Sequence, residues 1–494
     1  MQSVGAAWLM TSLTPSTTLV GLVQTAGTLP IFLIGILAGA LADLADRKAL
    51  LLWSQAWMLV MTALLGVLTL MGWTTPWVLL GLTFAIGMGG AISLPAWQAT
   101  VQDIVPKPWI ASAISLNSIA FNVARAVGPA LGGLVVATLG AAFAFFSNTL
   151  SFLAVMFAIA SWKPKPAPES RTSEDIVGAI RAGTRYLLHA PRLQAPIIRA
   201  VAFNICAAAV WPLLPLLARD VLHTTATGYG LLLAAFGFGS IISAMAVPRL
   251  RNRFQLDRIL ALGSIVAALA YFGLSLSRHP VAAGICMVFA GMAWVGVLVN
   301  FNVAVQTSVP DWVRGRALAF YLLAFQGAMA LNGALWGWLA GIIGIAPCFD
   351  VAAVGLLLGL ALIRFFPLDI DDSIDLRPSS QWPEAHAGLE ADPDDGPVLV
   401  TVEYLVPAEN AAFRVLMPQL RERRLRDGAR RWRLYHDAQQ ADRFLELFRL
   451  DSWGEHLRQH ERATVADQDV ESRVLALHQG PARPKIAHYF GVDE

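Results

Sequence analysis

Residues 39–48 read Gly39-Ala-Leu-Ala-Asp-Leu-Ala-Asp-Arg-Lys48 and place four charges within ten positions. They separate two uncharged apolar runs, Thr18–Ala38 and Ala49–Met71. Each run is long enough to cross a bilayer as a helix, which takes about 20 residues. A short charged segment between two such runs predicts a tight turn at a membrane face.

Apolar runs of this length recur along the first three quarters of the chain. We place eleven of them, at 18–41, 49–71, 75–98, 110–138, 142–162, 196–219, 227–248, 258–277, 281–305, 315–343 and 347–366. Residues 1–13 would make a twelfth, but such a helix covers only about two-thirds of the hydrocarbon thickness. We expect either a first helix that is truncated at its start or a half-buried N-terminal segment.

Composition divides the chain into a membrane body and a soluble C-terminal segment. Only 14% of the 494 residues are charged, whereas soluble domains carry about 25%. Residues 1–366 hold 20 basic and 10 acidic residues, but residues 367–494 hold 16 basic and 24 acidic ones. Cys206, Cys286 and Cys348 lie far apart in apolar segments, so neither a metal site nor a disulfide framework is indicated.

Lysine and arginine are unevenly shared between the two sets of connections. One set carries Arg47, Lys48, Lys107, Lys163, Lys165, Arg171, Arg181, Arg185, Arg192, Arg249, Arg251, Arg253, Arg314 and Arg316. The other set carries only Arg219 and Arg278. Because Lys and Arg mark cytoplasmic connections, the 39–48 turn, the long 163–195 connection and the C-terminal segment are expected inside the cell.

An internal repeat supports two parallel halves. Gln102-Asp-Ile-Val-Pro106 matches Gln306-Thr-Ser-Val-Pro310 at an offset of 204, which also brings Gly133 onto Gly337; a similar match puts Gly21 over Gly230. We therefore expect an all-α polytopic membrane protein with two six-helix halves that rock around a midplane site. The expected domains are helical halves at 1–162 and 196–368, a cytoplasmic loop at 163–195, a disordered acidic linker at 369–397 and a soluble domain at 398–494.

The span pattern, the charged turn and the long central loop resemble the major facilitator superfamily. Its loop motif, Gly-x-Leu-Ala-Asp-x-x-Gly-Arg-Arg/Lys, is matched by Gly39, Asp43, Arg47 and Lys48, whereas Asp46 replaces the second glycine. The resemblance implies that Asp43 joins the two halves at the cytoplasmic face, where a carboxylate can bind a helix N-terminus. The plainer interpretation is a solvated turn whose basic residues only set the topology.

A second motif lies in the 110–138 run. Gly128-Pro129-Ala-Leu-Gly132-Gly133 puts small residues on one helix face, and Pro129 can kink the helix. In the superfamily a Gly-Pro-x-x-Gly-Gly stretch on the fifth helix is typical of exporters that exchange substrate for protons. Ordinary close packing of small residues is the alternative, and import remains a weaker one.

Charged and polar residues inside the spans are the candidate substrate or coupling groups. Arg125 lies deep within its run, and an intramembrane charge suggests a functional site. Asn117 and Asn122 share roughly its helix face, so all three are expected to line the central cavity. Asp350, near the start of the last run, is the other candidate, although it could simply cap its helix. Proton coupling is implied by the resemblance alone.

Further polar and aromatic side chains lie within the runs. Asn204, Asn300 and Asn332 are each expected to join neighbouring helices rather than bind a ligand. Trp97, Trp211, Trp294, Trp336 and Trp338 could line a cavity, although interfacial anchoring is expected for most of them.

The C-terminal segment predicts a small cytoplasmic domain. Strands are expected at 398–404, 429–436, 442–450 and 485–490, and helices at 408–426, 452–461 and 467–478, an order typical of ferredoxin-like folds. It resembles the antibiotic-biosynthesis-monooxygenase-like α+β barrel domains, which some members of the transmembrane secretion effector subgroup carry. Surface positions are expected for His436, His456, His460 and His478, and a solvated or lipid-contacting cluster for Arg421, Arg423, Arg424, Arg426, Arg430, Arg431 and Arg433.

The leading hypothesis is a secondary exporter in the cell inner membrane that moves a siderophore-like or drug-like molecule outward, with protons as the coupling partner. Neither a cofactor, a metal, a catalytic residue nor nucleic acid is implied, and the C-terminal domain could support dimerisation. The alternative is a membrane-anchored enzyme whose catalysis lies in that domain. A Gly-x4-Gly-Lys-Ser/Thr phosphate loop does not occur in the sequence, which argues against an ATP-driven pump.

Overall fold

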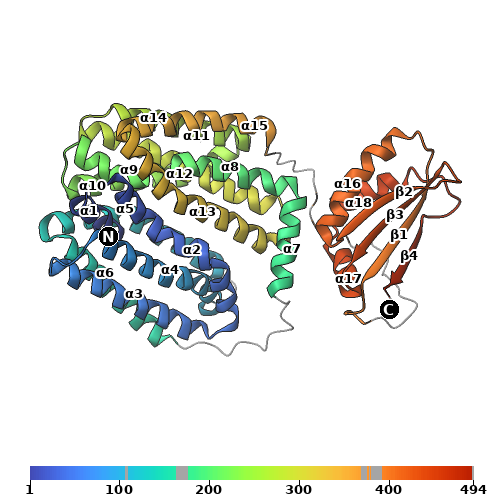
Figure 1. The fold of residues 1–494 in the computed structure, drawn as a ribbon, viewed down its shortest axis with the longest axis horizontal. Coiled ribbons are helices and arrows are strands. Elements are labelled where there is room, and N and C mark those ends of the chain that lie inside the picture. The colour runs from blue at the N-terminus through green and yellow to red at the C-terminus, as the bar shows by residue number, and fades with distance from the viewer. Residues whose placement is uncertain are drawn as a thin grey trace. The chain divides into compact units, whose positions relative to one another are not determined.

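The computed structural model describes residues 1–105, 109–162, 176–368, 375, 377, 379 and 392–491 (Figure 1). Its helices before the C-terminal domain are α1 (Gln2–Leu13), α2 (Thr17–Leu44), α3 (Arg47–Leu70), α4 (Pro76–Ile104), α5 (Ile110–Leu139), α6 (Ala141–Ser161), α7 (Ile176–His189), α8 (Pro191–Ala207), α9 (Val210–Leu216), α10 (Ala226–Arg251), α11 (Leu256–Leu276), α12 (Pro280–Thr307), α13 (Asp311–Ile343), α14 (Ile345–Leu358) and α15 (Leu362–Phe365). A π-helical turn, Leu217–Val221, follows α9, and a 3₁₀ turn, Gly359–Ala361, precedes α15.

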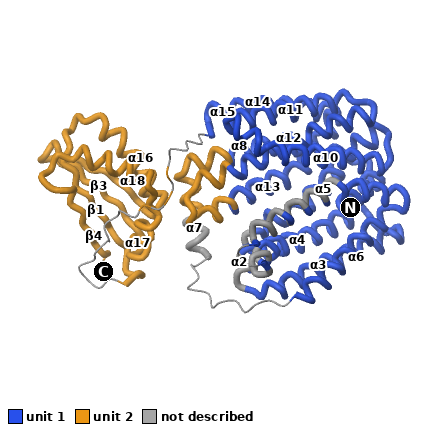
Figure 2. The backbone as a smooth tube through the Cα atoms, turned by 180° about the vertical axis from the view of Figure 1, so that it is seen from behind, with its two compact units in different colours: residues 1–171, 197–303, 319–368 blue, residues 172–196, 304–318, 369–494 orange. Residues whose placement is uncertain are grey.

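The chain forms two compact units (Figure 2). Unit 1 contains residues 1–171, 197–303 and 319–368, and unit 2 contains residues 172–196, 304–318 and 369–494. Unit 2 therefore combines α7 and the connection between α12 and α13 with the C-terminal segment.

The predicted membrane spans are confirmed in ten places. Ten helices among the described residues are long and apolar enough to cross a membrane. The eleventh predicted run, 110–138, coincides with α5, a continuous helix of 30 residues. The N-terminal run forms α1, which has only 12 residues.

Local sequence explains where several of these helices begin. The Ser16 hydroxyl accepts a hydrogen bond from Leu19 N–H at 3.4 Å and caps α2. Thr75 caps α4 in the same way, and Pro76 follows at the first helical position, where its missing N–H costs nothing. These caps satisfy N–H groups that have no partner within the helix.

The internal repeat is visible in the backbone. Gly140 joins α5 to α6 with φ of 95°, and Gly344 joins α13 to α14 with φ of 91°. These glycines are also 204 residues apart, and both values lie in the left-handed region that favours glycine. Each glycine N–H closes the preceding helix by donating to a carbonyl four residues back, Val136 in one case and Ala340 in the other.

The C-terminal segment forms an antiparallel sheet of four strands covered by helices (Figure 1). Its elements are β1 (Val398–Leu405), α16 (Ala411–Asp427), β2 (Arg431–His436), β3 (Arg443–Leu450), α17 (Trp453–Arg462), α18 (Val465–Leu475) and β4 (Lys485–Phe490), and the strand order is β2-β3-β1-β4. In β1 every second side chain is buried, from Val398 to Tyr404. These side chains pack with Phe413 and Leu420 of α16 and with Val470 of α18.

Part of the expected disordered linker is bonded to this domain. Ala466 N–H donates to the carbonyl of Asp375, and Val465 N–H donates to that of Arg377, both at 3.0 Å. The Ser379 N–H donates to Ala463 O at 2.8 Å. These three positions of the predicted linker therefore satisfy backbone groups around the start of α18.

Candidate functional site

Asp46, the departure from the loop motif, is the N-cap of α3. Its carboxylate accepts hydrogen bonds from Lys48 N–H at 2.8 Å and Ala49 N–H at 3.1 Å. Its φ of −59° lies outside the left-handed region, so the turn needs no glycine there. A carboxylate at a helix N-terminus is favourable, and the substitution therefore keeps the turn by a different means.

Lys48 fixes the end of a neighbouring helix. Its Nζ donates to the carbonyls of Ala160 at 2.8 Å and Trp162 at 2.6 Å, at the C-terminus of α6. Cations at helix C-termini satisfy carbonyls that lack partners and interact well with the helix dipole. Gly39 has open space where a Cβ would stand, so steric contact does not explain a glycine there.

Several predicted residues lie outside the described part of the structure. The side chain of Asp43, near the end of α2, is not described, nor are those of Asn117, Asn122 and Arg125 in α5. Their predicted roles stay predictions. Asp350 does not cap its helix, because α14 begins after Gly344 and places Asp350 in the second turn.

The Gly128–Gly133 motif packs α5 against α10. A Cβ on Gly133 would lie 2.6 Å from Ala226 O and 2.8 Å from Gly230 Cα. A Cβ on Gly128 would meet no atom within 4 Å. The two helix backbones therefore cross so closely that only glycine fits at Gly133, whereas Gly128 is not sterically required.

A second crossing of the same kind joins α2 to α13. A Cβ on Gly337 would lie 2.8 Å from Thr17 O and 3.1 Å from Gly21 Cα. Thr17 and Thr25 strengthen this crossing, because their hydroxyls donate to Gly337 O at 2.8 Å and to Ala330 O at 2.6 Å.

The repeat relates these two crossings. Gly133 corresponds to Gly337, and Gly230 corresponds to Gly21, so each crossing pairs a glycine of one half with a glycine of the other. We call these four glycines, together with Gly333 on α13, the glycine seam. All lie within a few turns of the ends where α2 and α10 begin and where α5 and α13 finish. The repeat was visible in the sequence. The contact between its glycines across the two halves was not, because it depends on how the helices pack.

Two further contacts join the halves near the seam. The Arg219 guanidinium donates to Thr11 O near the C-terminus of α1, and it also pairs with Asp220. The Trp8 ring stacks on Tyr229 of α10, with centroids 6.0 Å apart. Glycine crossings, a charge at a helix end and ring stacking thus close this end of unit 1.

One span in the C-terminal half is broken. The α8 helix ends at Ala207, and α9 restarts at Val210. At this break Ala207 O accepts a hydrogen bond from the Tyr271 hydroxyl, and Ile205 O accepts one from Trp336 Nε1 at 2.8 Å. Irregular backbone is tolerated at membrane depth only when its polar groups find such partners. Two prolines in the predicted run, Pro212 and Pro215, were the signal that could have revealed the break.

An aromatic and amide cluster surrounds the break. The Trp211 ring lies 5.0 Å from Phe236 and 5.8 Å from Trp294, measured between centroids. Asn204 Nδ2 donates to Phe325 O at 3.1 Å, and Asn332 Nδ2 donates to Asn204 O at 3.0 Å. The expected roles of Asn204 and Asn332 in joining helices are therefore confirmed.

Two buried polar atoms of this cluster have no hydrogen-bond partner in the described structure. Within the described residues, Trp211 Nε1 and Asn332 Oδ1 are buried without a hydrogen-bond partner. Of the tryptophans considered, Trp294 and Trp336 are buried, whereas Trp97 and Trp338 are exposed in the described structure. Discontinuous helices form the substrate sites of many transporters, so this part of the C-terminal half is a candidate substrate wall.

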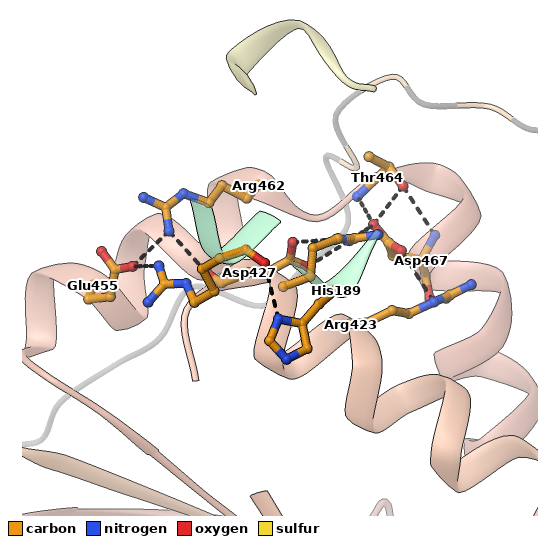
Figure 3. Close-up of polar contacts among 9 residues, drawn as sticks. His189, Arg423, Asp427, Glu455, Arg462, Thr464 and Asp467 are labelled. Atoms are coloured by element: carbon orange, nitrogen blue, oxygen red, sulfur yellow. Dashed lines mark hydrogen bonds and ion pairs between the residues drawn. The ribbon is translucent and has the colours of Figure 1, made fainter. Parts of the chain in front are cut away.

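Unit 2 is held together by a carboxylate shared among three arginines; Figure 3 shows it with Arg462. Glu455 on α17 accepts hydrogen bonds from Arg185 of α7 at 2.6 Å, Arg462 at 2.8 Å and Arg458 at 2.9 Å. Burial opposes ionisation of Glu455, but Arg462 and Arg185 outweigh it and lower its pKa. Arg185 also donates to Gly428 O at 3.0 Å. These bonds fix α7 to the C-terminal domain.

Aromatic rings extend this junction to the first turn of α13. Trp312 packs edge-on against Tyr186 of α7, with centroids 5.6 Å apart. Arg462 lies 4.8 Å from the Trp312 ring centroid, and Arg426 lies 5.5 Å from that of Tyr186. Stacking of guanidinium groups on aromatic faces is favourable when water is excluded.

Three of the seven arginines in the basic cluster predicted on the surface are internal. Arg424 is buried and bonded to Glu446 at 3.3 Å and Glu471 at 2.9 Å. Arg423 and Arg426 both pair with Asp467, which also forms a capping box with Thr464 at the start of α18 (Figure 3). The expected solvated surface is therefore wrong for these three arginines, because helical spacing turns them toward α18.

Other arginines of the cluster line an open groove. Arg421, Arg430, Arg431 and Arg433 lie along a groove of about 1110 Å³ between α7, α16 and β2. His436 is exposed as expected, but His456 is only 2% exposed. The sequence pattern missed His456 because it resembled a surface helix position.

The fold and these crossings define a multi-pass helical membrane protein built from two repeat-related halves. A family model described as a transmembrane secretion effector matches residues 1–494, so the chain belongs to that family of major facilitator superfamily transporters. The family is one of transporters rather than enzymes.

Similar curated proteins carry names of transport functions. The staphyloferrin A transporter of Staphylococcus aureus is 24% identical over 358 residues, covering 71% of this chain and 88% of that protein. The multidrug efflux pump Tap of Mycolicibacterium fortuitum is 24% identical over 379 residues, covering 74% and 91%. The enterobactin exporter EntS of Shigella boydii is 25% identical over 367 residues, covering 71% and 85%.

Solved structures show the same fold. A point mutant of the nucleoside transporter NupG aligns with a TM-score of 0.63 at 12% identity and covers 74% of this chain and 94% of that one. A bacterial homolog of the human lysosomal transporter Spinster aligns with a TM-score of 0.54 at 13% identity, covering 74% and 92%.

Proposed function

We propose that the protein is a secondary exporter that moves a small organic molecule out of the cell across the inner membrane by alternating access. The observation that carries this proposal is the glycine seam. Its two repeat-related crossings join the halves at one end, which is the arrangement expected when two parallel halves rock about a central site. The names of the relatives, which include siderophore and drug transporters, support a siderophore-like or drug-like substrate.

The distribution of positive charge supports an orientation for the seam. The seam lies at the end that carries Arg219, whereas the Arg47–Lys48 turn lies at the other end of α2 and α3. By the positive-inside rule the seam faces outward. A closed seam then corresponds to a state that receives substrate from the cytoplasm.

The same reasoning supports a cytoplasmic C-terminal domain. The domain shares unit 2 with residues 304–318, which carry Arg314 and Arg316. Its antiparallel strand order, β2-β3-β1-β4, also supports a ferredoxin-like fold. Its edge strands β2 and β4 offer surfaces for the dimerisation expected from the sequence.

Proton antiport is part of the proposal. Asp43 would close the cytoplasmic end, Arg125 with Asn117 and Asn122 would bind substrate, and Asp350 is the remaining coupling candidate. The position of Asp350 within the apolar helix α14 supports a role in proton coupling, because a carboxylate inside a span is costly and is usually functional.

Transport by inside-out vesicles tests this function. Vesicles that contain the protein should accumulate a transported siderophore-like or drug-like compound only when an imposed pH gradient supplies protons on the inside. A small panel of such compounds, with and without an uncoupler, distinguishes coupled export from passive binding. Accumulation of no compound by folded, oriented protein would contradict the proposed function.

Arg125→Ala should lower this accumulation roughly ten- to a hundredfold. A hydrogen bond to a charged group contributes about 1.5–3 kcal/mol, which corresponds to that range. Val127→Ala, two residues further along α5 and exposed, is the matched control and should transport normally. Normal transport by Arg125→Ala would remove Arg125 from the proposed binding site.

A further inference from the structure

A cavity in the C-terminal domain carries polar groups that the transport function does not use. It has a volume of about 890 Å³ and lies between strands β1, β3 and β4 and helices α17 and α18. That volume is in the range of pockets that hold drug-sized molecules. Val400, Val402, Phe448, Leu475 and Ile486 supply its apolar wall.

His456 is the group that points to a ligand. It lines the cavity, is only 2% exposed, and neither of its ring nitrogens has a hydrogen-bond partner in the described chain. The neighbouring Gln459 Nε2 is also buried without a partner. A buried polar group without a partner costs about 1–3 kcal/mol, so a ligand that bonds to these two neighbouring groups would be stabilised there.

An ion-pair network lies along one side of the cavity. Glu446 accepts hydrogen bonds from the Tyr404 hydroxyl at 2.8 Å and from Trp432 Nε1 at 2.8 Å, and it pairs with Arg424. Arg424 also binds Glu471. These charged groups already have partners within the domain, so this part of the wall does not call for a charged ligand.

The histidines themselves are uncharged at neutral pH. The His456 ring centroid lies 4.6 Å from that of His460 and 4.8 Å from that of His488. Burial, followed by these two neighbours, lowers the pKa of His456 to about 3, although Gln459 acts in the opposite direction. Burial also lowers the pKa of His460 to about 4 and reduces that of His488. Among the described residues these histidines do not form a group that could hold a metal ion.

Neutral imidazole offers one N–H donor and one acceptor nitrogen. A hydroxyl group complements both, because it donates through its proton and accepts through its oxygen. The apolar wall and the nearby rings suit a flat aromatic body, which packs edge-on or offset against other rings.

We propose that this cavity, with His456 at its centre and Gln459 beside it, binds an uncharged aromatic compound that carries at least one hydroxyl group. The site is separate from the transport path in unit 1, and binding can be measured without transport. A negative result in the export assay would therefore not contradict this proposal. A negative result in the binding assay would not contradict the proposed export function.

The probe for a test is 2-naphthol, with naphthalene as the comparison that lacks the hydroxyl. The full-length protein in detergent, with its nine histidines labelled at Cε1, is titrated while histidine resonances are followed by NMR. We expect 2-naphthol to shift the resonances of His456, His460 and His488 but not that of His436. Naphthalene should bind there at least about tenfold more weakly.

The His456→Phe variant separates a ligand role from a structural one. It should bind 2-naphthol at least about tenfold more weakly, while its unfolding temperature stays equal or rises, because an apolar ring replaces an unpaired polar one. His436→Phe is the matched control and should bind normally. The proposal is overturned if 2-naphthol leaves the His456 resonance unshifted, if naphthalene binds equally well, or if His456→Phe binds as tightly as wild type. If the variant fails to fold, the titrations of the wild-type protein with 2-naphthol and naphthalene still test the proposal.

Discussion

Gly133→Ala should lower export about fivefold or more. The new Cβ would stand 2.6 Å from Ala226 O and 2.8 Å from Gly230 Cα, so α5 and α10 must separate. Overpacking of this kind costs about 1–3 kcal/mol, which shifts a two-state equilibrium roughly 5- to 150-fold. The closed seam loses this stability, and the open state becomes overpopulated. The measurement is initial uptake by inside-out vesicles.

Labelling of the seam provides the second measurement. On a background with Cys206, Cys286 and Cys348 replaced by alanine, a Thr18→Cys label site should react faster with an impermeant maleimide when Gly133→Ala is present. Gly128→Ala is the matched control, because its Cβ meets no atom within 4 Å. Equal export by the two alanine variants would contradict the steric role of the seam.

Arg199→Ala should cause the largest loss of folding stability, about 3 kcal/mol. Arg199, in the middle of α8, is 5% exposed, pairs with Asp257 of α11 and donates to Phe366 O at 3.2 Å. Breaking a buried pair costs about 3–5 kcal/mol, because it leaves the other charge without compensation. The Asp257 side chain is 25% exposed, so the low end applies. The apparent melting temperature of detergent-solubilised protein measures the loss.

A double variant tests the cause of this loss. Arg199→Ala with Asp257→Asn should recover part of the stability, since no unpaired carboxylate remains. Arg258→Ala, at the exposed position next to Asp257, should melt like wild type. An unchanged melting temperature for Arg199→Ala would mean that the pair contributes nothing to holding α8, α11 and the end of α15 together.

The membrane spans could be predicted from the sequence because their signal is local. A run of about 20 apolar residues must be a helix when it lies in lipid, since its backbone groups have no other partners. The repeat offset of 204 was also visible in the sequence, whereas the glycine turns at Gly140 and Gly344 were recognised only in the structure. The positions of the four strands after residue 398 were likewise close to those observed.

Asp46 shows what a motif comparison alone misses. The superfamily pattern expects glycine there, and the motif itself carries no sign of how the turn is kept. In the structure the carboxylate caps α3, so a favourable helix start replaces the conformational freedom of glycine. The rule for N-caps was available, but applying it requires knowing that α3 begins at Arg47.

Partner choice across the fold could not be predicted. The break before Val210 is stable because Tyr271 and Trp336 reach its free carbonyls from helices far along the chain. Nothing in the sequence indicated that Arg424 is internal, because its partner Glu471 lies on α18, 47 residues further along the chain. His456 likewise became a candidate ligand group only once its burial and lack of partners were known.

The most direct test of the central claim is a reversible cross-link across the seam. A Cβ on Gly341 would lie 3.1 Å from the Thr17 hydroxyl oxygen, so Thr17→Cys with Gly341→Cys brings two thiols close enough for a disulfide on the cysteine-free background. The alternating-access account predicts that oxidation abolishes export by inside-out vesicles and that reduction restores it. Export at the wild-type rate by fully cross-linked protein would contradict the account.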